Sequence, residues 1–455
     1  MTTTPAESAG TATDTGRPEG PGRDAALLVA DHVAGVLLVM AVTEGGSDGK
    51  PGGEARGEPR AEEVARLTGC HLSEHAGFLA LPDGRVACVD ERAGELLLLD
   101  PLAALAGRSM PVTRVSVAVP AEQLAADPEG RYLVVGTGLG LNDEPWNDLL
   151  TVVDTTLGRG VRVRTRPDEP GVGVVGGEHF PDGAPRLVLR RRAPGSLDLH
   201  RFDDLWTAPT GSPRVEPIDR LPLPDDGLGD ADDPSDPAVA RVLTACGDGV
   251  HRARVVGDRL VAEPPLSWAT EGRGHYLRPE PGTDRVWSVV RGGPAEPTAW
   301  PEWTNTAWCR HTAAGRTEVT DLGPGLVFRA AFAAPGVAAF SRVHPDGDEL
   351  VLLPTRSADP GGAPPLPRRI PLPAMDGAPR RGGTPWDGVQ RRAIAASPAR
   401  HLVAVSRGGH GTVHLVDVRE PEHRMDLVLD TPLDEGGRLC LIAPGDGAHL
   451  DRRGR

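Results

Sequence analysis

The sequence predicts an all-β fold assembled from four-stranded antiparallel units, and two observations carry this prediction. First, short runs rich in valine and leucine recur along the chain, separated by glycine, proline and aspartate, which tolerate the dihedral angles of turns. The chain holds 58 glycines and 46 prolines in 455 residues, so turns are frequent and little helix is expected. Second, a turn returns at intervals of several tens of residues, which suits a unit of four strands and is far too long for a hairpin repeat.

Each copy of the repeat has the same parts in the same order. A short apolar strand leads into a turn, a strongly apolar strand follows, and a third strand ends in an apolar residue followed by aspartate. These strand ends align at Leu99-Asp100, Val153-Asp154, Phe202-Asp203 and Val416-Asp417. The repeating turns begin at Pro82, Pro128, Pro181, Cys246, Pro279, Pro335, Pro398 and Pro444.

The two ends of the chain differ in pattern. Residues 1–24 lack periodicity and are predicted to be a disordered tail, which leaves residues 25–455 for the repeat domain. In "AALLVADHVAGVLLVMAV", Asp31 and His32 interrupt an apolar run, so a pair of strands is expected in place of a signal peptide or membrane span. We expect a flexible loop at 44–60 and a solvated acidic loop at 225–237.

The stretch "LVAVSRGGHGTVHLVDV" is similar to the second and third strands of a WD repeat, with Val416 in place of the tryptophan of the Trp-Asp pair. On this stretch and the repeat spacing, residues 70–450 resemble the β-propeller superfamily, in its WD-repeat and related bacterial forms. Glycine-histidine openings are absent, so the resemblance is to divergent members. It implies a single propeller with seven blades preferred and eight as the alternative. The ring would be closed by two strands from each end of the chain.

Charge and reactive residues exclude several function classes. The net charge of -15 and pI of about 5.4 argue against nucleic-acid binding, which needs clustered positive charge. The only lysine, Lys50, lies in a predicted loop, so phosphate-loop and Schiff-base chemistry are not expected. Five cysteines without a C-x-x-C motif predict free, mostly buried thiols and a cytoplasmic protein. They are Cys70, Cys88, Cys246, Cys309 and Cys440.

His401, His410 and His414 raise the question of a metal site. If "SRGGHGT" forms a hairpin turn, His410 lies at its tip and the other two lie on separate strands. Strands rise ~3.3 Å per residue, so His401 and His414 are offset by roughly 10 Å along the ladder. Zinc–nitrogen bonds are about 2.0 to 2.1 Å long, so the three are not expected to share an ion.

Other ligand-like or catalytic patterns are also better explained by turns. "CHLSEH" has no second cluster of matching spacing, and the acidic run 225–237 lacks the register of a calcium loop. "GGSDG" lacks the strand and helix that a nucleophile elbow requires, and "GTGLG" lacks the third glycine of a dinucleotide site. We therefore predict no catalytic residue, no metal and no cofactor.

One aromatic cluster stands out, since half of the eight tryptophans occupy 22 residues. Trp287 and Trp308 lie in predicted strands and are expected in the core. Trp300 and Trp303 lie in a long connection, and in propellers the connections between second and third strands open on one face. We predict a partner-binding face there, with the alternative that the rings cap blade ends left open. Its residues are Asn142, Trp146, Asn147, Trp300, Trp303, Asn305 and His410.

The expected function is a non-enzymatic scaffold, a monomeric propeller that binds a protein or peptide and neither nucleic acid nor membrane. Tryptophan brings large contact area, and amides supply hydrogen bonds, to such interfaces. The alternative implied by the resemblance is a metal-dependent hydrolase of the lactonase type. Its cation would lie in the central channel with glutamate, aspartate and asparagine ligands.

Overall fold

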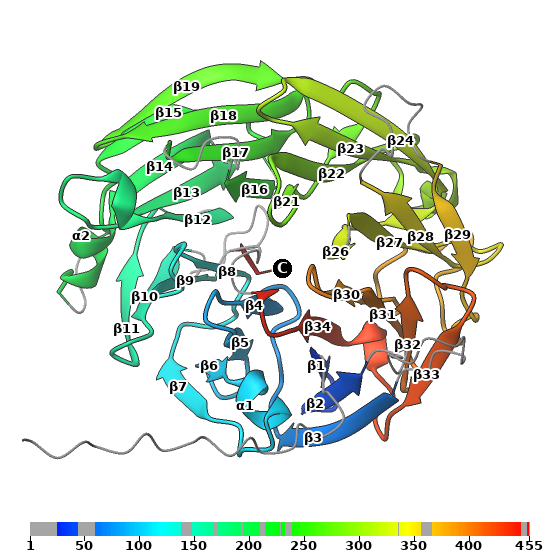
Figure 1. The fold of residues 1–455 in the computed structure, drawn as a ribbon. Helices are drawn as coiled ribbons and strands as arrows, with labels where there is room; N and C mark the ends of the chain where they lie inside the picture. The colour runs from blue at the N-terminus through cyan, green and yellow to red at the C-terminus, as the bar shows by residue number, and fades with distance from the viewer. Residues whose placement is uncertain are drawn as a thin grey trace, which may run out of the picture.

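A computed structural model shows eight antiparallel sheets arranged in a ring (Figure 1). It describes residues 25–43, 60–137, 148–166, 171–192, 194–209, 214–227, 229–232, 239–334, 336–355, 366–446 and 453–454. The chain is an eight-bladed β-propeller. Its blade number is the alternative of the two predicted counts, and the predicted turns fall in different blades, from Pro82 in blade 2 to Pro444 after the last strand of blade 1.

The blades are numbered along the chain, and their strands are given from the channel outward. Blade 1 is β34 (Arg438–Ile442), β1 (Ala25–Asp31), β2 (Val36–Thr43) and β3 (Arg60–Thr68). Blade 2 is β4 (Phe78–Ala80), β5 (Val86–Asp90), β6 (Glu95–Leu99) and β7 (Val112–Ser116). Blade 3 is β8 (Gln123–Ala126), β9 (Tyr132–Gly136), β10 (Leu149–Asp154) and β11 (Arg159–Arg164). Blade 4 is β12 (Gly171–Val175), β13 (Arg186–Arg192), β14 (Gly195–Arg201) and β15 (Asp219–Pro222).

The second half of the ring has the same order. Blade 5 is β16 (Gly229–Asp232), β17 (Arg241–Cys246), β18 (Gly249–Val256) and β19 (Arg259–Leu266). Blade 6 is β20 (Arg273–Gly274) and β21 (Arg278–Pro279), then β22 (Arg285–Gly292), β23 (Thr304–His311) and β24 (Arg316–Pro324). Blade 7 is β25 (Leu326–Val327) and β26 (Ala331–Ala333), then β27 (Val337–Val343), β28 (Glu349–Pro354) and β29 (Arg368–Pro371). Blade 8 is β30 (Ile394–Ala396), β31 (Leu402–Arg407), β32 (Thr412–Asp417) and β33 (Arg424–Val428).

Helix is confined to short connecting segments in the described residues, as the sequence predicted. The α-helices are α1 (Pro101–Leu105) and α2 (Phe202–Trp206), and the 3-10 turns are η1 (Gly177–His179), η2 (Pro297–Glu302) and η3 (Asp434–Gly436). No helix within the described ranges is both long and apolar enough to cross a membrane. The last strand, β35 (Arg453–Gly454), pairs with β8 at the inner edge of blade 3.

The hydrophobic core consists of layers between neighbouring blades. Alternate residues of a strand point to opposite faces of its sheet, so a blade packed on both sides needs apolar residues at successive positions. In β1, Leu27 and Val29 face blade 8, whereas Leu28 and Ala30 face blade 2. All four side chains are fully buried. This two-sided burial explains why the middle strands read as continuous apolar runs.

Strands from the N-terminal and C-terminal parts of the chain meet in blade 1, where β34 pairs with β1 from Ala26↔Ile442 to Ala30↔Arg438 (Figure 1). In the described residues the C-terminal stretch gives this blade one strand and the N-terminal stretch gives three, not the two and two that we predicted. The sequence concealed the third, β3, because it is the outer strand and carries exposed charged residues in place of an apolar run.

Two buried aspartates fix this closure. Asp31 accepts hydrogen bonds from the amides of Ala34 and Leu433, both at 2.9 Å, and from the hydroxyl of Thr431. Asp446, at the turn after β34, accepts from the amide of Ala443 at 2.7 Å. It also accepts from blade 8, through the hydroxyl of Ser397 at 2.8 Å and the amide of Ala399 at 3.0 Å.

The structure describes much of one predicted loop, 225–237, and only the last residue of the other, 44–60. The acidic run 225–237 is not all loop, because Gly229–Asp232 forms β16, the innermost strand of blade 5. The segment 44–60 is described only at Arg60, where β3 begins, and the predicted tail 1–24 lies outside the described residues. The five cysteines are free thiols, as predicted. Burial raises the pKa of Cys70 to about 11 and that of Cys440 to about 12, which makes both poor nucleophiles.

Deleting residues 438–455 should abolish cooperative folding, because it removes β34 and leaves the inner edge of β1 without a hydrogen-bonded partner strand. We expect aggregation and a broad thermal transition by circular dichroism. Deleting residues 451–455 is the matched control, since it removes only the short pairing of β35 with β8 and should leave the melting temperature nearly unchanged. A single, unshifted transition after the longer deletion would show that closure through β34 is dispensable.

Candidate functional site

The connections between strands gather on two opposite faces of the ring. Neighbouring strands are antiparallel, so the turn between the second and third strands of a blade opens on the same face as the connection to the next blade. We call this side the loop face. It carries, among others, residues 32–35, 69–77, 247–248, 293–303, 344–348, 372–393, 408–411 and 429–437.

The innermost strands differ in the charged residues that they bring to the central channel. β4, β12, β26 and β30 hold no ionisable residue. Other innermost strands carry charge, with Asp230 and Asp232 in β16, Arg273 in β20 and Arg438 in β34. Further charged groups lie on connections that lead into innermost strands, such as Glu74 before β4 and Glu435 before β34.

A cluster of His32, Glu74 and Glu435 lies on the loop face where blades 8, 1 and 2 meet. One potential ligand atom from each residue lies within 4.8 Å of the other two. Burial lowers the pKa of His32, and the nearby positive charge of Arg438 lowers it further, so the imidazole is neutral near pH 7. Its Nδ1 atom is buried and has no hydrogen-bond partner in the described part of the chain.

Two arginines neutralise the carboxylates of this cluster. Nη2 of Arg391 lies 2.7 Å from Oε1 of Glu74 and 2.5 Å from Oε2 of Glu435. Arg438 lies 3.5 Å from the Glu74 carboxylate and donates to its backbone oxygen at 2.7 and 2.9 Å. A cation bound here would have to displace a guanidinium that already bridges both carboxylates. The cluster is therefore best described as an electrostatic clamp between blades.

The clamp controls the titration of Glu74. Burial alone would raise the pKa of this carboxyl group, but the charge and hydrogen bond of Arg391, together with Arg438, hold it below its ordinary value. A carboxyl group whose pKa is depressed in the folded state stabilises the fold above the pKa of the unfolded chain. That contribution is lost as the pH falls through the folded-state value.

Replacing Arg391 with glutamine should lower the free energy of unfolding at pH 7 by about 1 to 2 kcal/mol, because two half-buried carboxylates lose their partner. Urea unfolding at pH 7 and pH 3 measures the effect, which should be smaller at pH 3, because protonation of Glu74 at low pH removes the charge that Arg391 pairs with. The control is Arg114→Gln, at the exposed pair with Glu95. A loss of equal size at both pH values would contradict the clamp.

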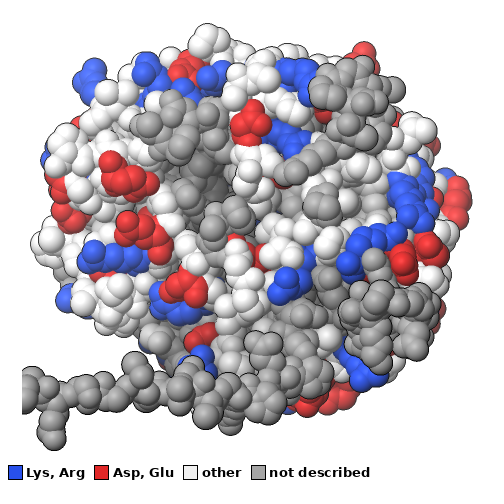
Figure 2. Space-filling model, viewed as in Figure 1, with Lys and Arg blue, Asp and Glu red and all other residues white. Residues whose placement is uncertain are grey.

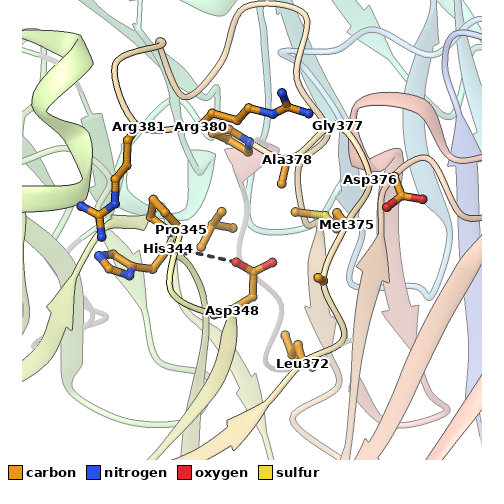
Figure 3. A pocket seen from close by; sticks show the side chains of 14 residues that line it. His344, Pro345, Asp348, Leu372, Met375, Asp376, Gly377, Ala378, Arg380 and Arg381 are labelled. Carbon is orange, nitrogen blue, oxygen red and sulfur yellow. Dashed lines mark hydrogen bonds between the residues drawn. The ribbon is translucent and has the colours of Figure 1, made fainter.

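A pocket of about 600 Å³ lies elsewhere on the loop face, between the β27–β28 turn and the long connection from blade 7 to blade 8 (Figure 3). Its apolar lining includes Val343, Leu372 and Met375, which are buried. Arg380 and Arg381 extend across the opposite side of the pocket in Figure 3. The pocket thus combines an apolar wall with two exposed guanidinium groups.

The charged side chains around this pocket differ in whether they have ion-pair or hydrogen-bond partners among the described residues. Arg381 pairs with Asp346 through hydrogen bonds of 2.8 and 2.9 Å. Asp348 accepts from the amide of His344 at 3.1 Å (Figure 3) and from Arg392 at 2.8 Å. Arg380 is exposed, and its guanidinium has no ion pair or hydrogen bond within the described residues.

The predicted aromatic residues support this pocket from beneath. Trp300, Trp303 and Met375 belong to one buried cluster. Trp303 stacks on Trp386 with ring centroids 5.7 Å apart, and Trp300 packs edge-on against His344 at 6.5 Å. These rings are therefore fully or almost fully covered, with Trp300 0% and Trp303 5% exposed.

Burial corrects one part of the sequence interpretation. Trp300 and Trp303 are not exposed anchors in this conformation, because their long proline-rich connection folds back as η2 and buries both rings. Asn305 is also buried, and its amide nitrogen donates to the carbonyl oxygens of Gly323 and Gly325 at 3.1 and 2.9 Å. Binding of a partner by these residues remains a prediction, and they can contribute to it only through the pocket they support.

His410 and the remaining predicted residues complete this comparison. His410 lies at the tip of the β31–β32 turn, as predicted, and its Nε2 accepts the amide of Asp376 at 2.8 Å, which holds the pocket connection against blade 8. Asn142, Trp146 and Asn147 lie outside the described residues.

His401, His410 and His414 are close together in the sequence but are separated in the structure. The register pairs His414 with Val405, so His414 and His401 are about 13 Å apart along the ladder. His414 is fully buried and its Nδ1 lies 2.7 Å from Asp426, whereas His410 contacts the pocket connection.

The "CHLSEH" motif also divides among partners. Nδ1 of His71 lies 3.2 Å from the backbone oxygen of His32, and Nδ1 of His75 lies 2.7 Å from Glu122. The member that joins a three-residue cluster is Glu74, which sequence spacing did not single out. No local signal could have found it, because His32 and Glu435 come from opposite ends of the chain.

Comparison with known proteins gives matches in three-dimensional structure and none in sequence. No protein-family model matches the sequence, and no curated protein sequence matches it. The chain is similar to the structure of apo AztD from Citrobacter koseri, with 10% identity over 94% of this chain and 99% of that chain, at a TM-score of 0.58. It is also similar to the dihydro-heme d1 dehydrogenase NirN in complex with DHE, with 17% identity over 95% and 77%, at a TM-score of 0.54.

A further match is the periplasmic gluconolactonase PpgL of Pseudomonas aeruginosa, with 16% identity over 92% of this chain and 99% of that chain, at a TM-score of 0.45. The likeness is one of fold. The two structures with TM-scores of 0.58 and 0.54 share the fold of this chain, and at 10% and 17% identity the likeness transfers no site residue.

Replacing Trp300 with alanine should destabilise the protein by about 3 to 5 kcal/mol, because it empties a fully buried site beneath the pocket. Urea unfolding at neutral pH measures the loss. Trp206→Ala is the matched control, since this ring is only half-buried and packs against Phe202, so a smaller loss is expected. A loss below about 1 kcal/mol in the free energy of unfolding for Trp300→Ala would indicate that the Trp300 ring is exposed to solvent.

Proposed function

We propose that the protein is a binding module that takes a polypeptide segment in the pocket between blades 7 and 8. The observation that carries this proposal is Arg380, an exposed guanidinium beside an apolar wall with no charged partner in the described residues. Arginine recognises carboxylates through paired hydrogen bonds of fixed geometry. The matching ligand presents a carboxylate next to an apolar side chain.

The size and composition of the pocket support a peptide ligand. A volume of about 600 Å³ lies within the range of ligand sites and holds several side chains. Met375 supplies a flexible, polarisable wall that adapts to different apolar groups. Val343 and Leu372 extend this wall, so an apolar side chain entering beside the carboxylate loses its contact with water.

Preorganisation also favours binding over catalysis. The connection 372–393 is tied to its surroundings by His410 and by Arg392, which donates to Asp348. The cluster of Trp300 and Trp303 supports it from below. A pocket that is already held in shape loses less conformational freedom when its ligand binds.

The loop-face arrangement favours this scaffold function over the hydrolase alternative. Four of the innermost strands, β4, β12, β26 and β30, hold no ionisable residue, and Asn305 is buried within β23. In the view of Figure 2, positive and negative side chains are interspersed around the ring, without one dominant charged field. Recognition would then depend on a local site such as the pocket and not on long-range steering.

Fluorescein-labelled hexapeptides containing a glutamate beside a leucine test this function by fluorescence anisotropy. We expect saturable binding to the wild-type protein and at least tenfold weaker binding to Arg380→Glu, because the charge that meets the carboxylate is reversed. A matched peptide set with lysine in place of glutamate should bind wild type at least tenfold more weakly.

The control variant is Arg259→Glu, which makes the same charge change at a 79% exposed side chain in the hairpin between β18 and β19, away from the loop face. It should bind the acidic peptides as wild type does. Equal binding of acidic and basic peptides, or unchanged affinity in Arg380→Glu, would refute the proposal. Melting temperatures of both variants should match wild type, which separates lost binding from lost folding.

A further inference from the structure

A second group of potential ligands lies on the loop face in blade 5, in the hairpin that joins β17 to β18. The register pairs Cys246 with Gly249 and Thr244 with His251. Directly paired residues point to the same side of a sheet, and that side alternates along each strand. Cys246 and His251 are therefore diagonal neighbours on one side of the hairpin, with Asp248 in the turn between them.

The three side chains converge. One ligand atom from each of Cys246, Asp248 and His251 lies within 4.8 Å of the other two. Nε2 of His251 lies 2.9 Å from Oδ1 of Asp248. In a tetrahedral zinc site, bonds of about 2.0 to 2.3 Å put neighbouring ligand atoms roughly 3.3 to 3.7 Å apart. Small side-chain rotations close the remaining difference.

We propose that Cys246, Asp248 and His251 form a binding site for a divalent transition-metal ion of the zinc class. The ligand set decides the class of ion, because thiolate and imidazole favour zinc and its neighbours, whereas magnesium and calcium prefer an all-oxygen set. One thiolate and one carboxylate also balance the charge of a divalent ion. The spacing C-x-D-x-x-H places all three ligands on a single short hairpin.

The surroundings give this site a fixed geometry. The indole nitrogen of Trp268 donates to the backbone oxygen of Cys246 at 2.9 Å, which holds the strand end in place. Asp226, from the connection between blades 4 and 5, accepts the amide of Gly247 at 3.0 Å through Oδ2. Its Oδ1 atom is buried without a hydrogen-bond partner in the described residues, so Asp226 offers a further oxygen beside the turn.

Access and charge distinguish this group from the clamp around Glu74. Cys246 is fully buried, whereas the Asp248 side chain is 64% exposed and His251 is 22% exposed, so an ion reaches the site from solvent. Within the described part of the chain, no arginine pairs with Asp248, and binding there requires no displaced guanidinium. Arg273 lies 3.9 Å from Asp226, and among the described residues it forms an ion pair with that aspartate alone.

Cobalt substitution tests the site directly, because a cysteine thiolate bound to Co²⁺ gives an intense near-ultraviolet charge-transfer band. Chelator-stripped protein should take up one Co²⁺ with this band, and one equivalent of Zn²⁺ should abolish it. Cys246→Ser should lose the band, and His251→Asn should weaken Zn²⁺ binding at least tenfold in competition with a chromophoric chelator.

The matched controls are Cys309→Ser and His311→Asn in blade 6, which change a buried thiol and an imidazole beside Glu318. Both should bind as wild type does. The proposal is overturned if cobalt-loaded wild type shows no thiolate band, or if Cys246→Ser and His251→Asn bind Zn²⁺ within twofold of wild type. Should Cys246→Ser fail to fold, His251→Asn and the wild-type cobalt spectrum decide the outcome on the same criteria.

Discussion

The pairing of β34 with β1 is the constraint on which the rest of this structure depends. Each blade buries apolar side chains on both of its faces, so no blade is satisfied until it has two neighbours. The hydrogen bonds that join β34 to β1 complete the ring, and Asp31 and Asp446 fix the two chain ends around that junction. The positions of the loop-face residues follow from this closed ring, since every connection is placed by the blades on either side of it.

The same ring treats its charged groups in two different ways. Around Glu74 and Glu435, Arg391 from another connection and Arg438 from β34 bring the charge close to balance, and the result holds blades together. Among the residues that the structure describes, Arg380 at the pocket has no such partner, and Asp248 at the blade 5 hairpin faces a histidine and a thiol in place of a guanidinium. A ligand gains most binding free energy where a charged group without a partner lies next to apolar or rigid surroundings.

Much of the fold was predictable because it rests on local signals. Turn residues and valine-rich runs predicted the strands, and the Asp ending of β10 and β32 predicted their boundaries. The strand that was not predicted is β3. It is an outer strand whose exposed face carries charge, so it lacks the apolar run by which the other strands were predicted. The blade count was left between two values because only four units carry the apolar-Asp ending and WD-type glycine-histidine openings do not mark the others.

The sites were less predictable, for physical reasons that particular residues make clear. Trp300 and Trp303 were correctly noticed as unusual, but composition cannot tell an exposed ring from one covered by its own connection. His32, Glu74 and Glu435 meet only through ring closure, so their spacing along the chain carries no information. Cys246, Asp248 and His251 are local, yet a single motif without a matching second half resembles an ordinary turn until the strand register is known.

Placing the first strands of the chain in the same blade as one of its last also has a consequence for synthesis. β1 leaves the ribosome with its inner edge unpaired, and its partner β34 follows only after roughly 400 further residues. At a translation rate of roughly 5 to 20 residues per second, that interval lasts about 20 to 80 seconds. During this time a strand that is apolar from Ala25 to Ala30 and has an open edge depends on the nascent chain, or on a chaperone, to keep it from pairing with another molecule.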